Sequence, residues 1–508
     1  MEKYFSTFRN HIIGINHTLY TPYHKSIPIV YTDWTASGRL YQAIEDKLQL
    51  YLFPYVANTH TETNDTGKLT TKAYHKAKQI IKSHVGASIS DVLISSGTGM
   101  TGVINKFQRI LGLKIHEVFE NAIQIDEQER PIVFISHMEH HSNQTTWIET
   151  IADVEIIEPD KNGLVSIENF KNILSKYSHR AMKILSITAC SNVTGIQTPY
   201  MDMAEIIHQN GGLCFVDFAC SAPYVEINMH EDDSKGRYLD AIYFSPHKFL
   251  GGPGSSGILI FNKKMYKNAV PDNSGGGTVD WTNPWGGKKY INSIEEREDG
   301  GTPAFLQTIK AAMCCQLKNA MGVDNIIKRE SQIIDLIWED LKSIETLHIL
   351  ADNIKERLAI ISFYIDDLHY NLGVKLLNDK FGIQSRGGCS CAGTYGHYLL
   401  NVDKEKSRMI TCSINDGDFS TKPGWIRISF HPTSSDKEIK FVISAIKELA
   451  LHHKKWRTDY DVNLYNGQIM NKKNDSIFRI EKHIDSCFDF SEKLVVKYER
   501  QSMIFNVL

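Results

Sequence analysis

Short apolar runs alternate with stretches of helical periodicity along the first part of the chain. Each run has the length of a buried strand and ends in turn residues, and a helical pattern follows several of them. The runs cover 91–94, 131–135, 182–188, 212–216, 241–244 and 257–261, and helices are expected up to 106 and over 140–150 and 201–209. This alternation predicts an α/β fold with a mostly parallel sheet, in which ligands bind at the carboxyl ends of the strands.

The pattern changes after about Gly322, where longer helices and fewer strands predict a smaller α+β domain. Its expected elements are helices over 324–343 and 436–451, strands over 358–365 and 425–430, and a Gly/Cys segment over 386–396. We therefore divide the chain into an N-terminal arm (1–30), a large domain (31–320), a small domain (321–456) and a C-terminal extension (457–508). The extension holds a polar segment, 463–475, and a tail to which the sequence assigns no role.

Composition and charge exclude several classes of protein. A chain of 508 residues is too long for one compact domain, and its 42% hydrophobic and 23% charged residues are ordinary globular values. Its 56 basic and 59 acidic residues give a net charge of −3, so it lacks the basic footprint of a nucleic-acid-binding protein. No apolar run approaches the ~20 residues of a membrane span, and the first residues show no signal-peptide pattern. We expect a cytoplasmic protein without nucleic-acid or membrane partners.

The nine cysteines form no CxxC pair, which argues against a zinc ribbon or a thioredoxin-type motif. In a reducing compartment most of them would be buried small hydrophobes, with one reactive member among them. We expect no metal site.

Lys248 stands out among the lysines because it follows the apolar strand 241–244 and precedes a glycine-rich turn. Most lysines are solvated surface charges, but this context moves Lys248 toward the interior. A desolvated lysine has a lowered pKa and can form a Schiff base, as pyridoxal phosphate requires. That cofactor also needs a carboxylate against its pyridine nitrogen, and Asp217 ends the strand 212–216. The alternative role of Asp217 is a helix cap.

A glycine-rich segment, Ser95–Gly102, follows the first strand and opens a helix. Backbone N–H groups and the helix dipole at such a place bind a phosphate dianion. The expected phosphate-binding residues here are Gly97, Thr98, Gly99 and Met100. The same segment matches GxGxxG, so a dinucleotide site is the second interpretation of this motif. No strand-ending acid follows at about twenty residues, which weighs against it.

Further motifs appear in a fixed order along the chain: YTDWTASG (31–38), ANTH (57–60), EHHSN (139–143), SNVTG (191–195), SPHK (245–248), GGGT (275–278), GTP (301–303) and RGGCSCA (386–392). Together they resemble the class V, fold-type I pyridoxal-phosphate enzymes, and within them the group II branch of cysteine desulfurases and selenocysteine lyases. The resemblance runs from about Tyr31 to Leu451. It implies the fold-type I transferase architecture, with a mostly parallel seven-stranded sheet in the large domain and a small α+β domain.

The resemblance also implies roles for individual residues. His140 would stack on the ring of pyridoxal 5'-phosphate, Asp217 would pair with its pyridine nitrogen, and Lys248 would carry it. Asn192 would lie near its phenolic oxygen and near the substrate, and Ser245 and His247 would bind its phosphate. A homodimer is implied, in which Thr278 reaches the phosphate of the neighbouring subunit. The substrate would be bound by Ala36, Ser37, His60, Asn192, Arg386 and Arg427.

In the RGGCSCA segment, Arg386 would hold the substrate carboxylate with its planar fork, and Cys391 would attack the substrate sulfur. Arg427 matches a second arginine of the family. Two positions depart from the pattern: Cys220 stands where the family has glutamine, and Cys389 makes a Cys-x-Cys pair similar to the loop of molybdenum-cofactor sulfurases. If the loop were extended, the side chains of Cys389 and Cys391 would point to the same side.

The sequence thus predicts a pyridoxal-phosphate-dependent cysteine desulfurase with catalytic residues Lys248, Cys391, His140 and Asp217. It would convert L-cysteine to alanine, leave a persulfide on Cys391 and pass the sulfur to an acceptor protein. The alternatives are a class V aminotransferase, a selenocysteine lyase or another C–S lyase. A protein that carries thiols or metal on Cys389 and Cys391, without catalysis, is a third interpretation.

Overall fold

The computed structural model describes residues 1–59, 61–122, 124–473 and 476–489. Its centre is a seven-stranded sheet in the order β4-β12-β11-β8-β7-β5-β6. These strands are β4 (Asp91–Ser96), β5 (Ile132–Ser136), β6 (Asp153–Ile157), β7 (Lys183–Thr188), β8 (Leu213–Asp217), β11 (Ala241–Phe244) and β12 (Gly257–Asn262). β12 runs antiparallel to both of its neighbours, and the five strands from β11 to β6 are parallel. The expected α/β fold with a mostly parallel sheet of seven strands is confirmed.

The apolar runs form strands because both faces of the sheet are buried. Along β11, Ala241 and Tyr243 belong to one apolar cluster, whereas Ile242 and Phe244 belong to the cluster on the other side. Successive side chains of a strand point to opposite faces, so a strand covered on both sides needs an unbroken apolar run. The predicted strand 241–244 therefore coincides with β11.

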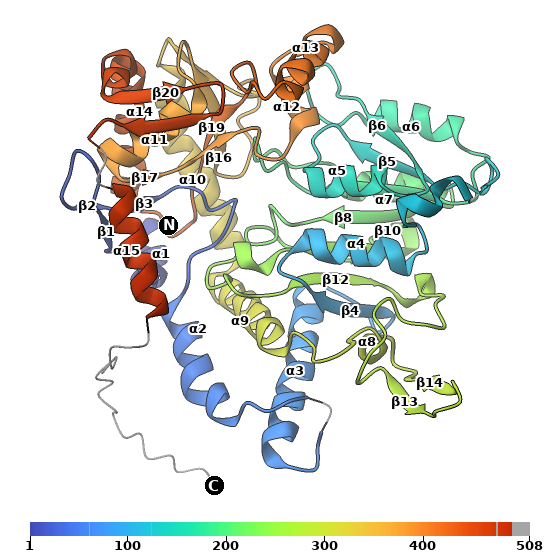
Figure 1. Ribbon diagram of the computed structural model, residues 1–508. Coiled ribbons are helices and arrows are strands. Elements are labelled where there is room, and N and C mark those ends of the chain that lie inside the picture. The colour runs from blue at the N-terminus through green and yellow to red at the C-terminus, as the bar shows by residue number, and fades with distance from the viewer. Residues whose placement is uncertain (60, 123, 474–475, 490–508) are drawn as a thin grey trace.

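Helices cover both faces (Figure 1). One face packs against α4 (Met100–Ile110) and α5 (His141–Ile148), and the other against α3 (Asp65–His84), α6 (Ile167–Lys176), α7 (Tyr200–Gln209) and α9 (Phe305–Met321). The helix expected to end near 106 continues to Ile110. The sequence pattern did not indicate α3 and α9, which pack against each other.

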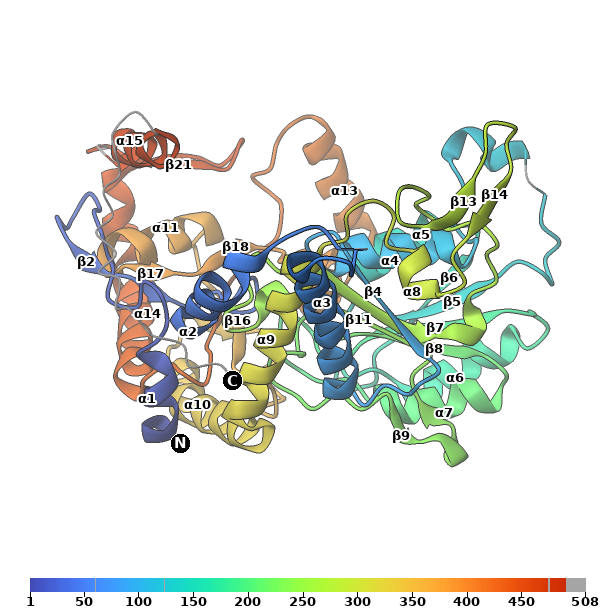
Figure 2. The ribbon, with the colours of Figure 1, turned by 90° about the horizontal axis from the view of Figure 1, so that it is seen from below.

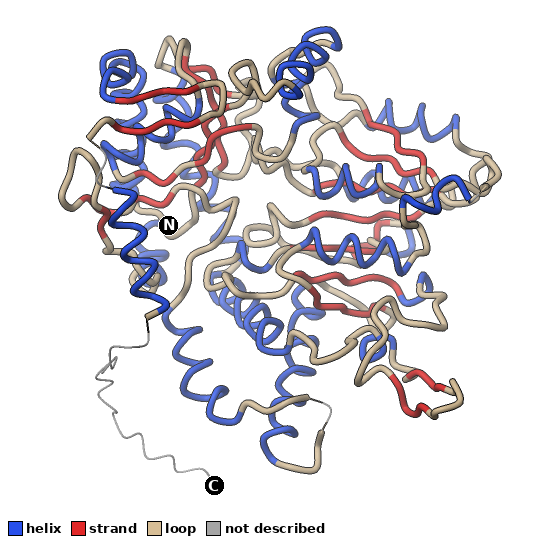
Figure 3. The backbone as a smooth tube through the Cα atoms, viewed as in Figure 1, coloured by secondary structure: helices blue, strands red, loops and turns tan. Residues whose placement is uncertain are grey.

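The small domain has a four-stranded antiparallel sheet in the order β15-β16-β19-β18. Its strands are β15 (Leu347–Ile349), β16 (Ile360–Ile365), β18 (Arg386–Gly388) and β19 (Trp425–Ser429), and its helices include α10 (Val323–Lys342), α11 (Tyr370–Phe381), α12 (Gly393–Leu399), α13 (Lys404–Asn415) and α14 (Asp436–Trp456). α10, α11 and α14 enclose a second apolar core against this sheet. Figure 3 shows the red strands of the two sheets as separate groups linked by tan loops.

The N-terminal residues run along the small domain. They form α1 (Glu2–Arg9), β1 (Thr18–Leu19), β2 (Ile27–Pro28) and β3 (Val30–Tyr31), which precede α2 (Gln42–Lys47). β3 pairs in parallel with β17 (Ile383–Gln384), and Asp33 bridges to Ser429. This pairing delivers the following residues, 33–37, to the gap between the two sheets.

The remaining strands and α8 are short, and α15 has 13 residues. They are β9 (His230–Asp232), β10 (Arg237–Tyr238), β13 (Val279–Thr282), β14 (Lys288–Tyr290), α8 (Ile294–Arg297), β20 (Tyr460–Asn463), β21 (Gln468–Asn471) and α15 (Ser476–Phe488). The polar segment 463–475 therefore includes one strand of a hairpin, β21, and the tail begins with a helix. Figure 2 shows the β13–β14 hairpin projecting from the large domain, far from α15 and β21. Among the described residues, none of the helices combines the length and apolar character of a membrane span.

Candidate active site

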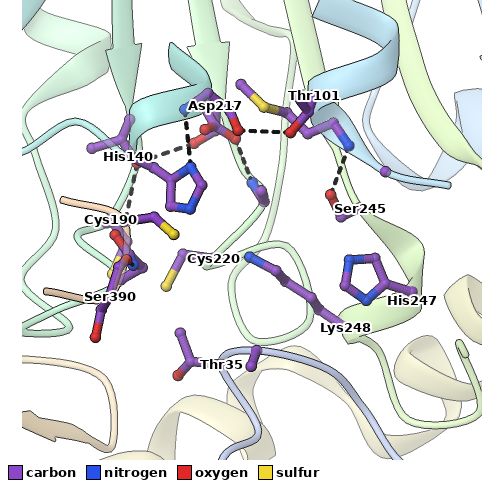
Figure 4. Close-up of a pocket in the computed structure, with 18 of the residues that line it drawn as sticks. Thr35, Thr101, His140, Cys190, Asp217, Cys220, Ser245, His247, Lys248 and Ser390 are labelled. Atoms are coloured by element: carbon purple, nitrogen blue, oxygen red, sulfur yellow. Dashed lines mark hydrogen bonds between the residues drawn. The ribbon is translucent and has the colours of Figure 1, made fainter. Parts of the chain in front are cut away.

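A cavity of about 410 Å³ opens where the carboxyl ends of the large sheet face the small domain. Fourteen of the residues singled out in the sequence line it: Ala36, Gly97, Thr98, Gly99, Met100, His140, Asn192, Asp217, Ser245, His247, Lys248, Arg386, Cys391 and Arg427. Figure 4 shows His140 and Asp217 on one side and His247 and Lys248 on another, all facing the same space. Residues from across the chain thus share one pocket.

Two expected site residues have other positions. Ser37 does not line the cavity, but its hydroxyl lies 3.4 Å from Nδ1 of His247. Thr278 is buried within its own loop, where its hydroxyl donates to the carbonyl oxygen of Gly275 (2.6 Å). His60 lies outside the described residues.

Nine lining residues were not named as site residues: Thr35, Thr101, Gly102, Ser142, Thr188, Cys190, Ala219, Cys220 and Ser390. Most of them stand within three positions of a motif residue, and that proximity is the signal that would have found them. Thr101 and Ser142 join α4 to α5, since their hydroxyl oxygens are 2.6 Å apart.

The amino end of α4 forms one end of the cavity. Its N-cap residue, Gly99, contributes no side-chain cap, and the N–H of Met100 donates to Oγ of Ser245 (2.8 Å). A Cβ atom on Gly99 would lie 3.1 Å from that Oγ and 3.6 Å from the ring of His247. The hollow exists because position 99 has no side chain. A helix N-terminus with a hydroxyl and an imidazole beside it suits a phosphate dianion.

Replacement of Gly99 by valine is expected to fill this hollow and to weaken retention of pyridoxal phosphate at least ~10-fold, because displaced phosphate contacts are charge-assisted. The control is Gly102→Ala on the same helix, where a Cβ would meet only ordinary contacts of 3.6 Å or more. Dialysis followed by absorption spectroscopy measures the retained cofactor. Equal retention by the two variants would refute the placement of the phosphate.

Asp217 and Lys248 face each other deeper in the cavity. Asp217 ends β8 and accepts the N–H of Ala219 at 2.8 Å, and burial raises the pKa of its carboxyl to about 6. Lys248 ends the short 3-10 helix Pro246–Lys248 after β11. Burial lowers the pKa of its amine, while Cys220 and Asp217 oppose that shift. A lysine with a lowered pKa supplies the neutral amine that attacks a carbonyl.

His140 caps α5 and is held in one orientation. Its Nδ1 accepts the N–H of Ser142 (3.1 Å), and burial together with the charge of Lys248 lowers its pKa to about 3. The ring is therefore neutral, with its proton on Nε2. Behind it, the buried carboxylate of Glu139 accepts hydrogen bonds from the N–H of Thr188 (2.9 Å) and the amide of Asn143 (2.7 Å). These bonds fix the start of α5 against the end of β7.

The loop that carries the two neighbouring cysteines is a tight turn and is not extended. The N–H of Ala392 donates to the carbonyl oxygen of Cys389 (3.0 Å), and Ser390 and Cys391 have φ angles of 51° and 56°. The loop therefore does not meet the condition, an extended backbone, under which both thiols would point to one side. Cys391 is exposed and lines the cavity, whereas Cys389 is half-buried and packs against the large-domain core.

Hydrogen bonds to the large domain hold this turn in place. The carbonyl oxygen of Cys391 accepts the N–H of His141 (2.7 Å), and that of Ser390 accepts the side-chain amide of Asn192 (2.7 Å). Two consecutive non-glycine residues in the left-handed region are uncommon and persist only where their surroundings enforce them, typically at functional sites. Asn192 thus holds the turn, a role that the sequence did not suggest.

The two arginines come from adjacent strands, where Arg386 on β18 lies opposite Arg427 on β19. Arg427 is buried, and its Nη1 donates to the carbonyl oxygen of Asn192 (2.9 Å). The carboxylate of Asp33 bonds both arginines. Its Oδ1 accepts a hydrogen bond from Nη2 of Arg427 (2.8 Å), and its Oδ2 accepts one from Nε of Arg386 (3.1 Å). The sequence had not indicated Asp33 as a site residue.

Cys220, at the position of the family's glutamine, lies beside a second buried thiol. The Sγ atoms of Cys220 and Cys190 are 3.7 Å and 3.6 Å from the carbonyl oxygen of Ser191. A hydrogen bond from Cys190 and the charge of Lys248 lower the pKa of Cys220, whereas burial raises that of Cys190. A thiol therefore lies near Lys248 at the position where the family has the amide of glutamine.

Comparison with known proteins identifies the family. The chain is 28% identical over 369 residues to a probable cysteine desulfurase of Halalkalibacterium halodurans, and the aligned region covers 72% of this chain and 84% of that protein. A probable cysteine desulfurase of Staphylococcus aureus is 26% identical over 368 residues, with 72% and 83% covered. Among solved structures, the fold resembles the cysteine desulfurase of Thermococcus onnurineus (TM-score 0.67, 21% identity, 83% and 95% covered). It also resembles the cysteine desulfurase CsdA of Escherichia coli (TM-score 0.67, 19% identity, 88% and 98% covered). The Aminotransferase class-V family model matches residues 30–442, and the chain therefore belongs to this family.

Proposed function

We propose that this protein is a pyridoxal-phosphate-dependent cysteine desulfurase. One observation carries the proposal: the exposed thiol of Cys391 lines the same cavity as Lys248, Asp217 and the two arginines. A lysine and a buried acid suit the cofactor, and an arginine pair suits an amino-acid carboxylate. The thiol adds the nucleophile that sulfur transfer needs. The names of the relatives at 28% and 26% identity support the same activity.

The lining residues fit pyridoxal 5'-phosphate from end to end. The amino end of α4, with Ser245 and His247, would hold the phosphate in the hollow at Gly99. The neutral ring of His140 would cover the pyridine ring, and the carboxylate of Asp217 would hold its nitrogen. When bound, the cofactor supplies the electron sink that stabilises negative charge on the substrate α-carbon.

The chain's own groups would then divide the work on L-cysteine. Arg386 and Arg427 bind the α-carboxylate, and Nζ of Lys248 takes the α-proton and returns a proton to carbon. The thiolate of Cys391 attacks the substrate sulfur, so a S–S bond forms as the C–S bond breaks. Two protons are then added to carbon, one at the new methyl group and one at the α-carbon; they balance the α-proton that Lys248 took and the proton that the substrate thiol gave up. Alanine leaves, and one sulfur atom remains on Cys391 as a persulfide. Because Cys391 is exposed, this sulfur is accessible to a thiol of an acceptor protein.

The proposal is tested by supplying L-cysteine and a thiol reductant and measuring sulfide, alanine and keto acid. We expect sulfide and alanine in equal amounts without keto acid. A keto acid formed in stoichiometric amount would establish an aminotransferase, and pyruvate with sulfide would establish another C–S lyase. A higher rate of selenide release from selenocysteine, unaffected by Cys391→Ser, would establish a selenocysteine lyase.

We also propose that the enzyme is a homodimer in the cytoplasm. An apolar groove of about 460 Å³ between α2, α3 and α9 supports association, since a groove of this character favours contact with a second protein surface. Its apolar lining consists of Tyr41, Ala43, Ile44, Ala73, Ala77, Ile80, Ile309, Ala312, Met313 and Leu317. The free thiols of all nine cysteines are consistent with a reducing compartment.

In the dimer, Thr278 would contact the phosphate of the neighbouring subunit. Thr278→Ala is therefore expected to weaken cofactor retention, about 10-fold, more than it weakens folding. The control is Thr282→Ala, which alters an exposed threonine on the same hairpin. Analytical sedimentation gives the oligomeric state, and a fully active monomer at working concentration would refute the dimer.

A further inference from the structure

Asp33 stands between the two arginines that the proposed function assigns to the substrate carboxylate. Its carboxylate is 14% exposed and bonds Arg427 through one oxygen and Arg386 through the other. The backbone bridge between Asp33 and Ser429, together with the hydrogen bond from Thr35 N–H to Oγ of Ser429 (3.0 Å), anchors this segment to β19. These backbone contacts hold Asp33 in position between the two arginines.

The three side chains leave donors free for a ligand. Within the described part of the chain, Nε of the 3% exposed Arg427 is buried without a hydrogen-bond partner. Arg386 bonds Asp33 through Nε, and its guanidinium is 46% exposed at the cavity. A buried donor without a partner costs free energy, so its persistence beside the cavity indicates a ligand acceptor.

The charges of this cluster sum to a single positive charge, because two guanidinium groups face one carboxylate. His140, which faces the same cavity, is neutral. A site with one net positive charge matches an amino acid whose single anionic group is its α-carboxylate. A second anionic group on the ligand would find no further guanidinium in this cluster to compensate it, and its desolvation would oppose binding.

Resting on the proposed function, we propose that Asp33 is a positioning and specificity-determining residue: it aims both arginines at the cavity and restricts the site to monocarboxylic amino acids. L-Cysteine belongs to this class. L-Aspartate, which has a carboxylate where cysteine has its thiol, does not. Asp33 acts through the arginines and touches no reacting atom.

The test compares L-alanine with L-aspartate, because both carry the same α-carboxylate and differ in the second charge. Each is titrated into the holoenzyme, and binding is followed by the change in visible absorption. Asp33→Asn preserves shape and one acceptor while it removes the negative charge. Removal of this negative charge raises the net positive charge of the cluster by one. We therefore expect the affinity for L-aspartate, relative to that for L-alanine, to rise about 10-fold, since the interaction with the second carboxylate is partly screened by solvent.

Two further variants separate charge from structure. Arg386→Gln removes one positive charge from a half-exposed side chain, and the same affinity ratio should fall about 10-fold. The double variant Asp33→Asn/Arg386→Gln restores the net charge, so its ratio should return close to that of the wild type. A merely structural ion pair does not predict this compensation. If Asp33→Asn alone fails to fold, the double variant is compared with Arg386→Gln, and the ratio should be about 10-fold higher in the double variant because only the charge of Asp33 differs between the two.

The matched control is Glu438→Gln, which neutralises a carboxylate bonded to Arg9 (2.7 Å) outside the cavity and should leave the ratio unchanged. A ratio that stays within twofold of the wild type in both Asp33→Asn and Arg386→Gln would overturn the proposal. Because the readout is ligand binding, it is independent of sulfide production. A protein that shows the expected ratios but releases no sulfide would refute the desulfurase and leave the role of Asp33 intact.

Discussion

Replacement of Lys248 by alanine is expected to abolish the Schiff-base absorption after incubation with pyridoxal phosphate, whereas the wild type purifies yellow. The Schiff-base absorption requires a covalent bond between the cofactor and a lysine amine, and Lys248 ends a 3-10 helix at the cavity that Asp217 also lines. Activity should fall by at least ~10³-fold, because the same amine moves the α-proton. Absorption spectroscopy and the sulfide assay measure the two effects.

Lys248→Arg provides the control, since it keeps a positive charge in the cavity but cannot form the covalent bond. It should equally lack the Schiff-base absorption and be inactive, with normal folding by circular dichroism. Lys264→Ala, on the exposed surface after β12, should keep the Schiff-base absorption. A Lys248→Ala protein that keeps this absorption, or a wild type that cannot be reconstituted with pyridoxal phosphate, would refute the whole account of the site.

Replacement of Cys391 by serine is expected to abolish sulfide release, at least ~10³-fold, while L-cysteine still changes the visible spectrum. Binding of the amino acid uses Lys248 and the arginines, which this change leaves intact, but serine cannot accept sulfur. Serine also keeps the size of the side chain at a residue with a φ angle of 56°, so the turn should persist. The sulfide assay and a spectral titration measure the two properties separately.

Cys389→Ser is the matched variant two residues away. Cys389 does not line the cavity, so turnover with a strong reductant should be retained. If Cys389 is the second thiol of a relay, its loss slows sulfur transfer to an acceptor protein. If it only packs in the loop, transfer is unchanged. Loss of sulfide release in Cys389→Ser but not in Cys391→Ser would reverse the assignment of the nucleophile.

The sequence predicted six of the seven strands of the large sheet, because a sheet buried on both faces needs unbroken apolar runs, as at β11. It missed β6, an edge strand whose side chains are mostly half-buried. It did not predict α3, whose buried face includes Thr70, Thr71 and Lys78. These polar side chains interrupt the apolar periodicity. Lys78 is buried because Asp299, more than two hundred positions away, lies 3.0 Å from its amine. Such a partner becomes visible only in the folded chain.

The site residues likewise include some that the sequence could predict and some that depend on partners distant in the sequence. Lys248, Asp217 and the residues before α4 were predictable because each follows a strand at the edge where ligands bind. Asp33 was not, since its partners Arg386 and Arg427 are more than three hundred positions away in the sequence. The left-handed turn at Ser390 and Cys391 was not predictable either, because neither residue type favours positive φ. The division into domains stays a prediction.

The central claim is that Cys391 takes the sulfur of L-cysteine, and one measurement tests it most directly. The wild-type holoenzyme is mixed with L-cysteine without reductant, and alanine is quantified while the cysteine-containing peptides are analysed by mass spectrometry. The account predicts one alanine per active site and one added sulfur atom on the peptide of Cys391, at that residue. Alanine without any sulfur adduct, or an adduct found only on Cys389, would contradict it.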